Sequence, residues 1–221
     1  MLVLFIIAMG ATLLVQAYLR STYSRWQNRP AASGLSGAQT AQTILSANGI
    51  TDVGVEEVKG VLTDHYDPIK KVVRLSTVNF RGSSVAAHAV AAHEVGHALQ
   101  HAQAYGPLKM RSALLPVANI GANFAPWLII LGFFLSMSGM VTVGIVLFGA
   151  AVLFQLVTLP VEYDASKRAG QQLEALGIAT TGEVAGTKQV LNAAALTYVA
   201  AAATSVMYLL YYISMFMGNR D

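Results

Sequence analysis

A stretch of 50 residues, 112–161, contains no Asp, Glu, Lys, Arg or His, and it restricts the fold more than any other feature of the sequence. A transmembrane helix needs about 20 consecutive apolar residues, so this stretch is long enough for two spans joined by a tight turn. The turn is expected at residues 136–139, and Pro126 is expected to kink the first helix without preventing it from spanning. The sequence therefore predicts a transmembrane hairpin over residues 112–161.

Two further segments, 1–19 and 192–217, are also free of charged residues and long enough to span a bilayer. Only 11% of the 221 residues are charged, against about 25% in ordinary soluble domains, and the mean hydropathy is +0.54. These values predict a mainly α-helical membrane protein with four transmembrane helices.

The first segment, 1–19, is interpreted as an uncleaved transmembrane anchor. The alternative is a cleaved signal peptide, for which Val15-Gln16-Ala17 offers a cleavage site of small residues. The positively charged region that begins such peptides is absent here, and this absence favours the anchor.

Basic residues lie next to the predicted spans and, with one exception, fall on one side of the membrane. They are Arg20, Arg25, Arg29, Lys109, Arg111, Lys167, Arg168 and Lys188, whereas the other side has only Arg220. The positive-inside rule then places this side in the cytoplasm and both termini outside, as in a multi-pass protein of the inner (plasma) membrane. Because these residues flank apolar runs and form no basic face, the lipid bilayer is an expected partner and nucleic acid is not.

The segments between the spans, 20–111 and 162–191, are predicted to be cytoplasmic. The first should contain a helix over 36–47, a small sheet, and a helix over 84–103 that is capped by Ser84. The predicted strands of the sheet are residues 53–58, 61–63 and 71–75. The second segment should be helical.

The helix predicted over 84–103 contains the pattern His93-Glu94-Val-Gly-His97. At about 100° per residue the two imidazoles lie within about 40° of each other, close enough to share one metal ion. Two imidazoles and one further ligand leave an open position on a tetrahedral zinc, where water becomes nucleophilic and Glu94 can take its proton. This is the chemistry of a zinc hydrolase, with Zn²⁺ as cofactor and Glu94 as catalytic base. The competing interpretation is a buried helix whose histidines only pack.

Glu162 and Asp164 are both candidates for the third zinc ligand. An even number of crossings returns the chain to the membrane face that it left, so the end of the third span comes back to the side of His93 and His97. Glu162 is preferred because it shares a helix face with Ser166, which could orient a ligand, whereas Asp164 points about 160° away from Glu162. The alternative for Glu162 is an interfacial charge that simply meets water. No thiolate can take part and no disulfide can form, because the chain has no Cys.

Three segments carry a resemblance to a known family. They are His93-Glu94-Val-Gly-His97, Leu159-Pro160-Val-Glu162-Tyr-Asp164-Ala-Ser166, and Leu62-Thr-Asp64-His65-Tyr66-Asp67-Pro68. Through most of residues 34–212 the chain resembles the YugP-type bacterial membrane neutral zinc metallopeptidases, and more distantly the HtpX-type and CAAX prenyl proteases. The resemblance implies metal ligands at 93, 97 and 162, a general base at 94, and a small gluzincin-like α+β zinc domain with a short antiparallel sheet. The HtpX pattern has an aspartate where this chain has Ser166.

The expected activity is hydrolysis of peptide bonds in membrane or membrane-proximal proteins, with the substrate backbone aligned by an edge strand within residues 64–76. The donor that stabilises the developing oxyanion is left open among His65, Tyr66, Tyr163 and Arg168. Two alternatives remain: a zinc hydrolase of a non-peptide substrate, and a non-catalytic membrane scaffold with a structural zinc. The scaffold is disfavoured because structural zinc sites usually have four protein ligands.

Overall fold

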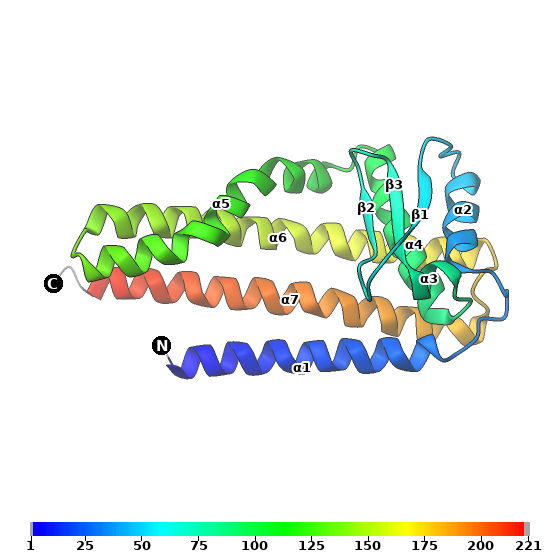
Figure 1. The fold of residues 1–221 in the computed structure, drawn as a ribbon, viewed down its shortest axis with the longest axis horizontal. Coiled ribbons are helices and arrows are strands. Elements are labelled where there is room, and N and C mark those ends of the chain that lie inside the picture. Colours follow the sequence, from blue (N-terminus) through cyan, green and yellow to red (C-terminus); the bar gives the residue numbers. More distant parts are fainter. Residues whose placement is uncertain (1, 219–221) are drawn as a thin grey trace. The chain divides into compact units, whose positions relative to one another are not determined.

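The computed structural model describes residues 2–218 and is mainly helical (Figure 1). In chain order its elements are α1 (Leu2–Gln27), α2 (Gly37–Ala47), β1 (Gly54–Val58), β2 (His65–Asp67), β3 (Val72–Ser76), α3 (Thr77–Arg81), α4 (Val85–Ala102), α5 (Gly106–Phe134), α6 (Ser138–Ala175) and α7 (Thr181–Gly218). The predicted combination of a mainly helical chain with one small sheet is confirmed.

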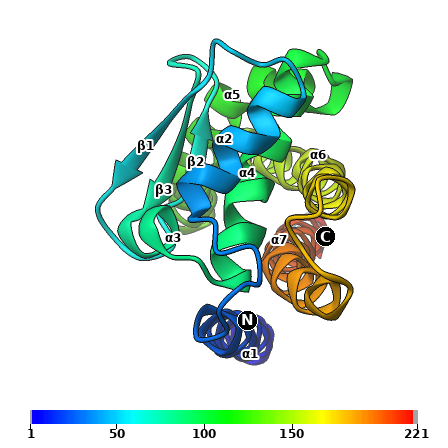
Figure 2. The same cartoon turned by 90° about the vertical axis from the view of Figure 1, so that its right-hand side faces the viewer.

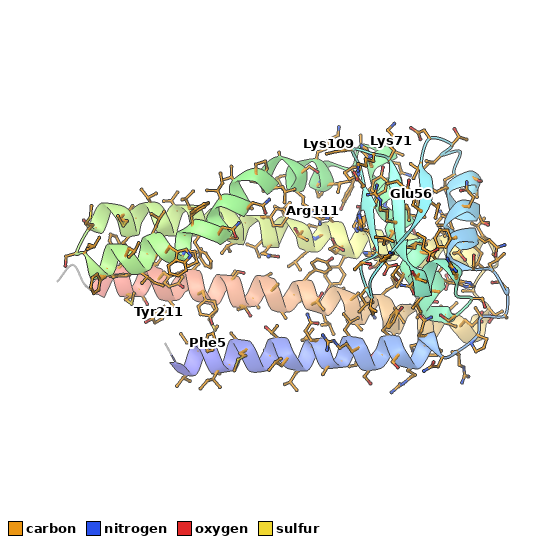
Figure 3. All side chains as sticks on the ribbon, viewed as in Figure 1. Phe5, Glu56, Lys71, Lys109, Arg111 and Tyr211 are labelled. Atoms are coloured by element: carbon orange, nitrogen blue, oxygen red, sulfur yellow. The ribbon has the colours of Figure 1, made fainter. Side chains whose placement is uncertain are left out.

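Within residues 2–218, four helices, α1, α5, α6 and α7, are long and apolar enough to cross a membrane. Pro116 and Pro126 lie inside α5, which is continuous but bent in Figure 1, as expected when proline interrupts the helical hydrogen bonds. Figure 3 shows Phe5 and Tyr211 on the apolar helices α1 and α7 and Lys109 near the beginning of α5. Exposed apolar side chains are the rule on these helices, and such surfaces are stable in contact with lipid. The chain is therefore a membrane protein with four candidate spans.

The chain forms two compact units. The first comprises Met1–Thr12, Gly106–Val161 and Tyr198–Asp221, and the second comprises Leu13–Tyr105 and Glu162–Thr197. The second unit contains the sheet, α2, α3 and α4, together with parts of α1, α6 and α7. The finer division into membrane and cytoplasmic segments stays a prediction.

The sheet has the strand order β1-β3-β2 and is mixed rather than wholly antiparallel. Strand β2 pairs antiparallel with β3, as expected, but β1 pairs parallel with β3. The predicted strand at residues 61–63 is instead part of a turn, in which Gly60 and Leu62 have φ values of 119° and 56°. This turn sends the chain through β2 before it returns as β3, so β3 runs in the same direction as β1 and β2 becomes an edge strand.

Helices α2 and α4 pack against each other and form the core of the second unit with the sheet (Figure 2). Ser36 and Gln39 form a capping box at the start of α2, which satisfies backbone groups that a helix leaves unpaired. Ile44 and Leu45 of α2 are fully buried. Ser84 caps α4 by accepting a hydrogen bond from the Ala87 amide, as the sequence predicted. The core therefore holds α4 firmly along its length.

A polar network fixes the turn that precedes β2. The carboxylate of Asp64 accepts hydrogen bonds from the Ser76 amide at 2.7 Å and from the Asn79 side chain at 3.0 Å. The Tyr23 hydroxyl in α1 donates to the Asn79 side-chain oxygen at 2.8 Å. These bonds connect the end of β3, helix α3 and the last turns of α1 to the beginning of the edge strand.

Candidate metal centre

Helix α4 presents both histidines of the His-Glu-x-x-His pattern on one face. The rings of His93 and His97 have centroids 4.9 Å apart and are inclined by 83°. The apolar residues on the opposite face of α4, among them Val95 and Leu99, are buried in the core of the unit. The two imidazoles therefore face away from the hydrophobic core. This position does not favour the interpretation in which the histidines only pack.

Helix α6 approaches α4 closely enough to bring Glu162 to these imidazoles. The close approach depends on Gly96, where an added Cβ would lie 2.6 Å from the carbonyl oxygen of Ala165. Ala165 itself is fully buried. Glu162 lies three residues before Ala165, almost one helical turn, and therefore faces the same side of α6. The pattern of small residues at 96 and 165 thus explains how a carboxylate distant in sequence reaches α4.

The carboxylate of Glu162 lies between the two imidazoles. Its Oε2 atom is 3.2 Å from Nε2 of His93 and 3.6 Å from Nε2 of His97. The three candidate ligand atoms all lie within 4.8 Å of one another, and Glu162 is only 2% exposed. A tetrahedral zinc with bonds of about 2.0–2.1 Å separates its ligand atoms by roughly 3.4 Å. The donor types and their spacing therefore fit a zinc ion.

The other ring nitrogen of each histidine also has a partner. Nδ1 of His93 lies 3.2 Å from the Ser166 hydroxyl, and Nδ1 of His97 lies 3.0 Å from the side-chain oxygen of Gln100. Such contacts fix the orientation of a ligating imidazole and leave Nε2 to face the metal. Ser166 therefore lies one helical turn after Glu162 and contacts a zinc-ligand candidate, which it could orient as expected from the sequence.

Asp164, the other candidate for the third ligand, points elsewhere. Its Oδ2 atom accepts a hydrogen bond from the Gln100 side-chain nitrogen at 2.9 Å and another from Arg168. The Arg168 guanidinium also donates to Gln103 and lies 5.7 Å from the ring centre of Tyr105. Asp164 is thus connected to the metal centre through Gln100.

Glu94 is almost completely buried, with 8% of its surface exposed. Burial raises the pKa of the Glu94 carboxyl, and the imidazoles of His93 and His97 oppose this increase. A carboxylate whose pKa is raised accepts a proton more readily than that of an ordinary glutamate. The position and electrostatics of Glu94 are therefore suitable for a general base.

The four candidates for oxyanion stabilisation have different surroundings. The Tyr66 hydroxyl lies 2.8 Å from Nδ1 of His101, and Nδ1 of His65 lies 2.8 Å from the carbonyl oxygen of Thr63. Tyr163 is 49% exposed. Arg168 is held by Asp164, which makes it a poor candidate.

Gln100 is the residue of this site that sequence reasoning missed. It is fully buried, although glutamine is usually exposed. The available signal was its position three residues after His97 on the same helix face. A polar residue at that spacing from a metal-ligating histidine can orient the imidazole.

Comparison with known proteins agrees with this chemistry. A family model described as "Putative neutral zinc metallopeptidase" matches residues 1–217. The chain is 47% identical over 218 residues to "Putative membrane protease YugP" of Bacillus subtilis (strain 168), and the match covers 99% of this chain and 97% of that protein. No solved structure matches the chain. The comparisons thus connect nearly the whole chain, with its apolar helices, to zinc peptidases of membranes.

Proposed function

Because the chain belongs to the neutral zinc metallopeptidase family and is therefore a zinc-dependent peptidase, we propose that it is an endopeptidase that cleaves membrane or membrane-proximal proteins. The observation that carries this proposal is the convergence of His93 and His97 with Glu162, whose ligand atoms lie within 4.8 Å of one another. In this proposal these three side chains hold the zinc, and Glu94 is the catalytic base. A polypeptide substrate follows from the peptidase class, and a membrane-embedded enzyme meets such substrates in or beside the bilayer.

A zinc ion held by His93, His97 and Glu162 would supply a Lewis acid that polarises the scissile carbonyl and lowers the pKa of water toward neutrality. Glu94 removes a proton from the attacking water while the new carbon–oxygen bond forms at the carbonyl carbon. When the carbon–nitrogen bond breaks, Glu94 delivers that proton to the departing amine. The products are a free carboxyl group and a free amine, and Glu94 returns to its ionised form.

The free side of edge strand β2 is the proposed binding surface for the substrate backbone. Strand β2 pairs with β3 on one side and lies at the margin of the sheet, and its Tyr66 contacts His101, one turn after His97 on α4. An extended polypeptide can add to such an edge through main-chain hydrogen bonds. This support comes from the topology of the sheet and from the contact between β2 and α4.

The proposed orientation follows from the distribution of basic residues. We place the zinc site and the segments 20–111 and 162–191 in the cytoplasm, with segments 1–19, 112–161 and 192–217 in the inner (plasma) membrane of a bacterium. The four candidate spans and the positive-inside rule support this arrangement. Accessibility of single cysteines introduced at exposed positions such as Lys70 to an impermeant thiol reagent would test it, because the chain has no Cys of its own.

The assigned roles can be separated with two variants of the purified, detergent-solubilised protein. Glu94→Gln should retain zinc and lose cleavage of casein or a membrane-protein substrate, because only the base is removed. Glu162→Ala should lose both zinc and cleavage. Retention of zinc in Glu162→Ala would refute the ligand assignment. Intact function of Glu94→Gln in cells, without cleavage of any substrate, would favour a scaffold with structural zinc, and a zinc-loaded protein that cleaves no peptide library would favour a non-peptide substrate.

A further inference from the structure

We propose that Asp164 and Gln100 are positioning residues that hold His97 in the one tautomer able to bind zinc through Nε2. The inference rests on the proposed function, because it takes His97 as a zinc ligand. The proposal concerns residues other than the zinc ligands and the catalytic base. It derives from a series of hydrogen bonds that runs from Arg168 through Asp164 and Gln100 to His97, and from which group must donate in each of them.

The direction is set at the outer end, by Arg168. A guanidinium group has only donors and a carboxylate has only acceptors, so the pairing of Arg168 with Asp164 leaves Asp164 as an acceptor. The side chains of both residues are largely shielded from solvent, with 20% and 24% exposure. Asp164 therefore requires a donor from its other neighbour, Gln100.

The amide of Gln100 transmits this requirement to the metal centre. Its nitrogen must face Asp164, at 2.9 Å, so its oxygen must face Nδ1 of His97, at 3.0 Å. An amide oxygen only accepts, and Nδ1 of His97 must then carry the proton. A neutral imidazole with its proton on Nδ1 has its lone pair on Nε2, the nitrogen that lies 3.6 Å from Glu162. Arg168 and Asp164 thus determine the tautomer of His97 through a fully buried amide.

His93 is held in a different way, which gives an internal comparison. Its Nδ1 atom contacts the hydroxyl of Ser166 at 3.2 Å, and a hydroxyl can either donate or accept. Ser166 therefore orients the ring of His93 without determining where its proton lies. The directional control in this centre acts on His97.

The test is an exchange of acid and amide along the chain of hydrogen bonds. In Asp164→Asn the new amide can donate as well as accept, so Gln100 can rotate and present its nitrogen to His97, which then places its proton on Nε2. The double variant, Gln100→Glu with Asp164→Asn, restores the direction because a carboxylate at position 100 only accepts. It accepts from the amide introduced at position 164 on one side and from Nδ1 of His97 on the other. The double variant also has the same net charge as the wild type.

Zinc affinity is measured by competition with a chelator on the solubilised full-length protein, and thermal unfolding is measured on the zinc-free protein. Asp164→Asn should bind zinc about 10- to 100-fold more weakly, as is typical when a residue that orients a metal ligand is changed. The double variant should recover most of that loss, and zinc-free stability should not follow the same order. Wild-type affinity in Asp164→Asn, or no recovery in the double variant, would overturn the proposal.

A parallel measurement on Glu162→Ala separates this proposal from the proposed function. If Glu162→Ala loses zinc and Asp164→Asn does not, only the positioning role fails. If Glu162→Ala retains zinc, the ligand set fails first. Ser166→Ala is the comparison variant: it removes a contact that orients His93 and leaves the hydrogen bonds from Arg168 to His97 intact, so any loss of zinc affinity in it should not be recovered by adding Gln100→Glu.

Discussion

The close approach of α4 and α6 at Gly96 gives a prediction whose magnitude can be worked out. In Gly96→Ala the new Cβ would lie 2.6 Å from the Ala165 carbonyl oxygen, against 3.4 Å or more in an ordinary contact. The helices would have to separate by about 0.8 Å to relieve this clash. Because His93 and Glu162 lie one turn away on the same two helices, the 3.2 Å distance between their ligand atoms should increase as well.

Gly170→Ala in α6 is a matched control, because nothing lies within 4 Å of a Cβ at that position. Both substitutions gain about 0.5–1 kcal/mol from replacing a glycine inside a helix. Their difference therefore isolates the cost of the clash, about 1–3 kcal/mol for an overpacked contact. For a protein of this size each kcal/mol shifts the melting temperature by about 2–4 °C, so Gly96→Ala should melt about 2–12 °C below Gly170→Ala.

Thermal unfolding of both variants in the same detergent and at the same zinc concentration measures this difference. Zinc affinity should also fall in Gly96→Ala, because zinc–ligand bond lengths vary by only about 0.2 Å and helices held apart carry their ligands away from the ion. It should be unchanged in Gly170→Ala. Equal melting temperatures and equal zinc affinities in the two variants would refute the reasoning. The route by which Glu162 reaches the histidines would then need another explanation.

Three further predictions concern zinc, protons and the polar network. Removal of zinc by a chelator should lower the melting temperature of the wild type, since a ligand at 100 times its Kd stabilises the folded state by about 2.7 kcal/mol. The same chelator should not change the melting temperature of Glu162→Ala. Burial lowers the pKa of His88 below its usual 6.5, so the unfolded chain takes up a proton that the folded chain does not. The free energy of unfolding should therefore fall as the pH drops below about 6.5, and denaturant titrations of His88→Gln should show a smaller fall. Asp64→Asn should destabilise the protein by about 1–3 kcal/mol, because the groups that donate hydrogen bonds to Asp64 lose an acceptor. Asp52→Asn breaks only an exposed ion pair with Lys71 and should have a smaller effect in the same unfolding assay.

The ends of several helices could be predicted because adjacent residues determine them. The pair Ser36 and Gln39 forms both hydrogen bonds of the capping box, and Ser84 begins α4 as expected. Gly177, with a φ of 64°, follows the end of α6, and Glu183 accepts from the Thr180 amide at the start of α7. Each of these signals lies within a few residues of the structure that it specifies.

The sheet was harder to predict because strand pairing depends on residues far apart in the chain. Residues 61–63 have the composition of a strand but form a turn, and the edge strand expected within residues 64–76 is the three-residue β2 at 65–67. The positive φ of Leu62 has no local sequence signal, since leucine rarely adopts it. The parallel pairing of β1 with β3 follows from this turn and could not be inferred without it.

In the candidate site, too, the features set by neighbouring residues could be predicted, whereas contacts between residues far apart in the chain were harder to predict. The spacing of His93 and His97 alone places both imidazoles on one helix face. The nearness of Glu162 followed from counting membrane crossings, and the structure places its Oε2 atom 3.2 Å from Nε2 of His93. The contact of Asp164 with Gln100 depends on how α6 rotates against α4, which no short segment encodes.

The brevity of strand β2 has a consequence for how a substrate would be captured. Its three residues offer an extended chain only a few main-chain hydrogen bonds, each worth about 0.5–1.5 kcal/mol. Such an edge binds weakly and with little regard to sequence. Confinement of enzyme and substrate to the same bilayer would compensate by raising their effective concentration. Selection would then depend on which proteins share that membrane and expose an unfolded segment there.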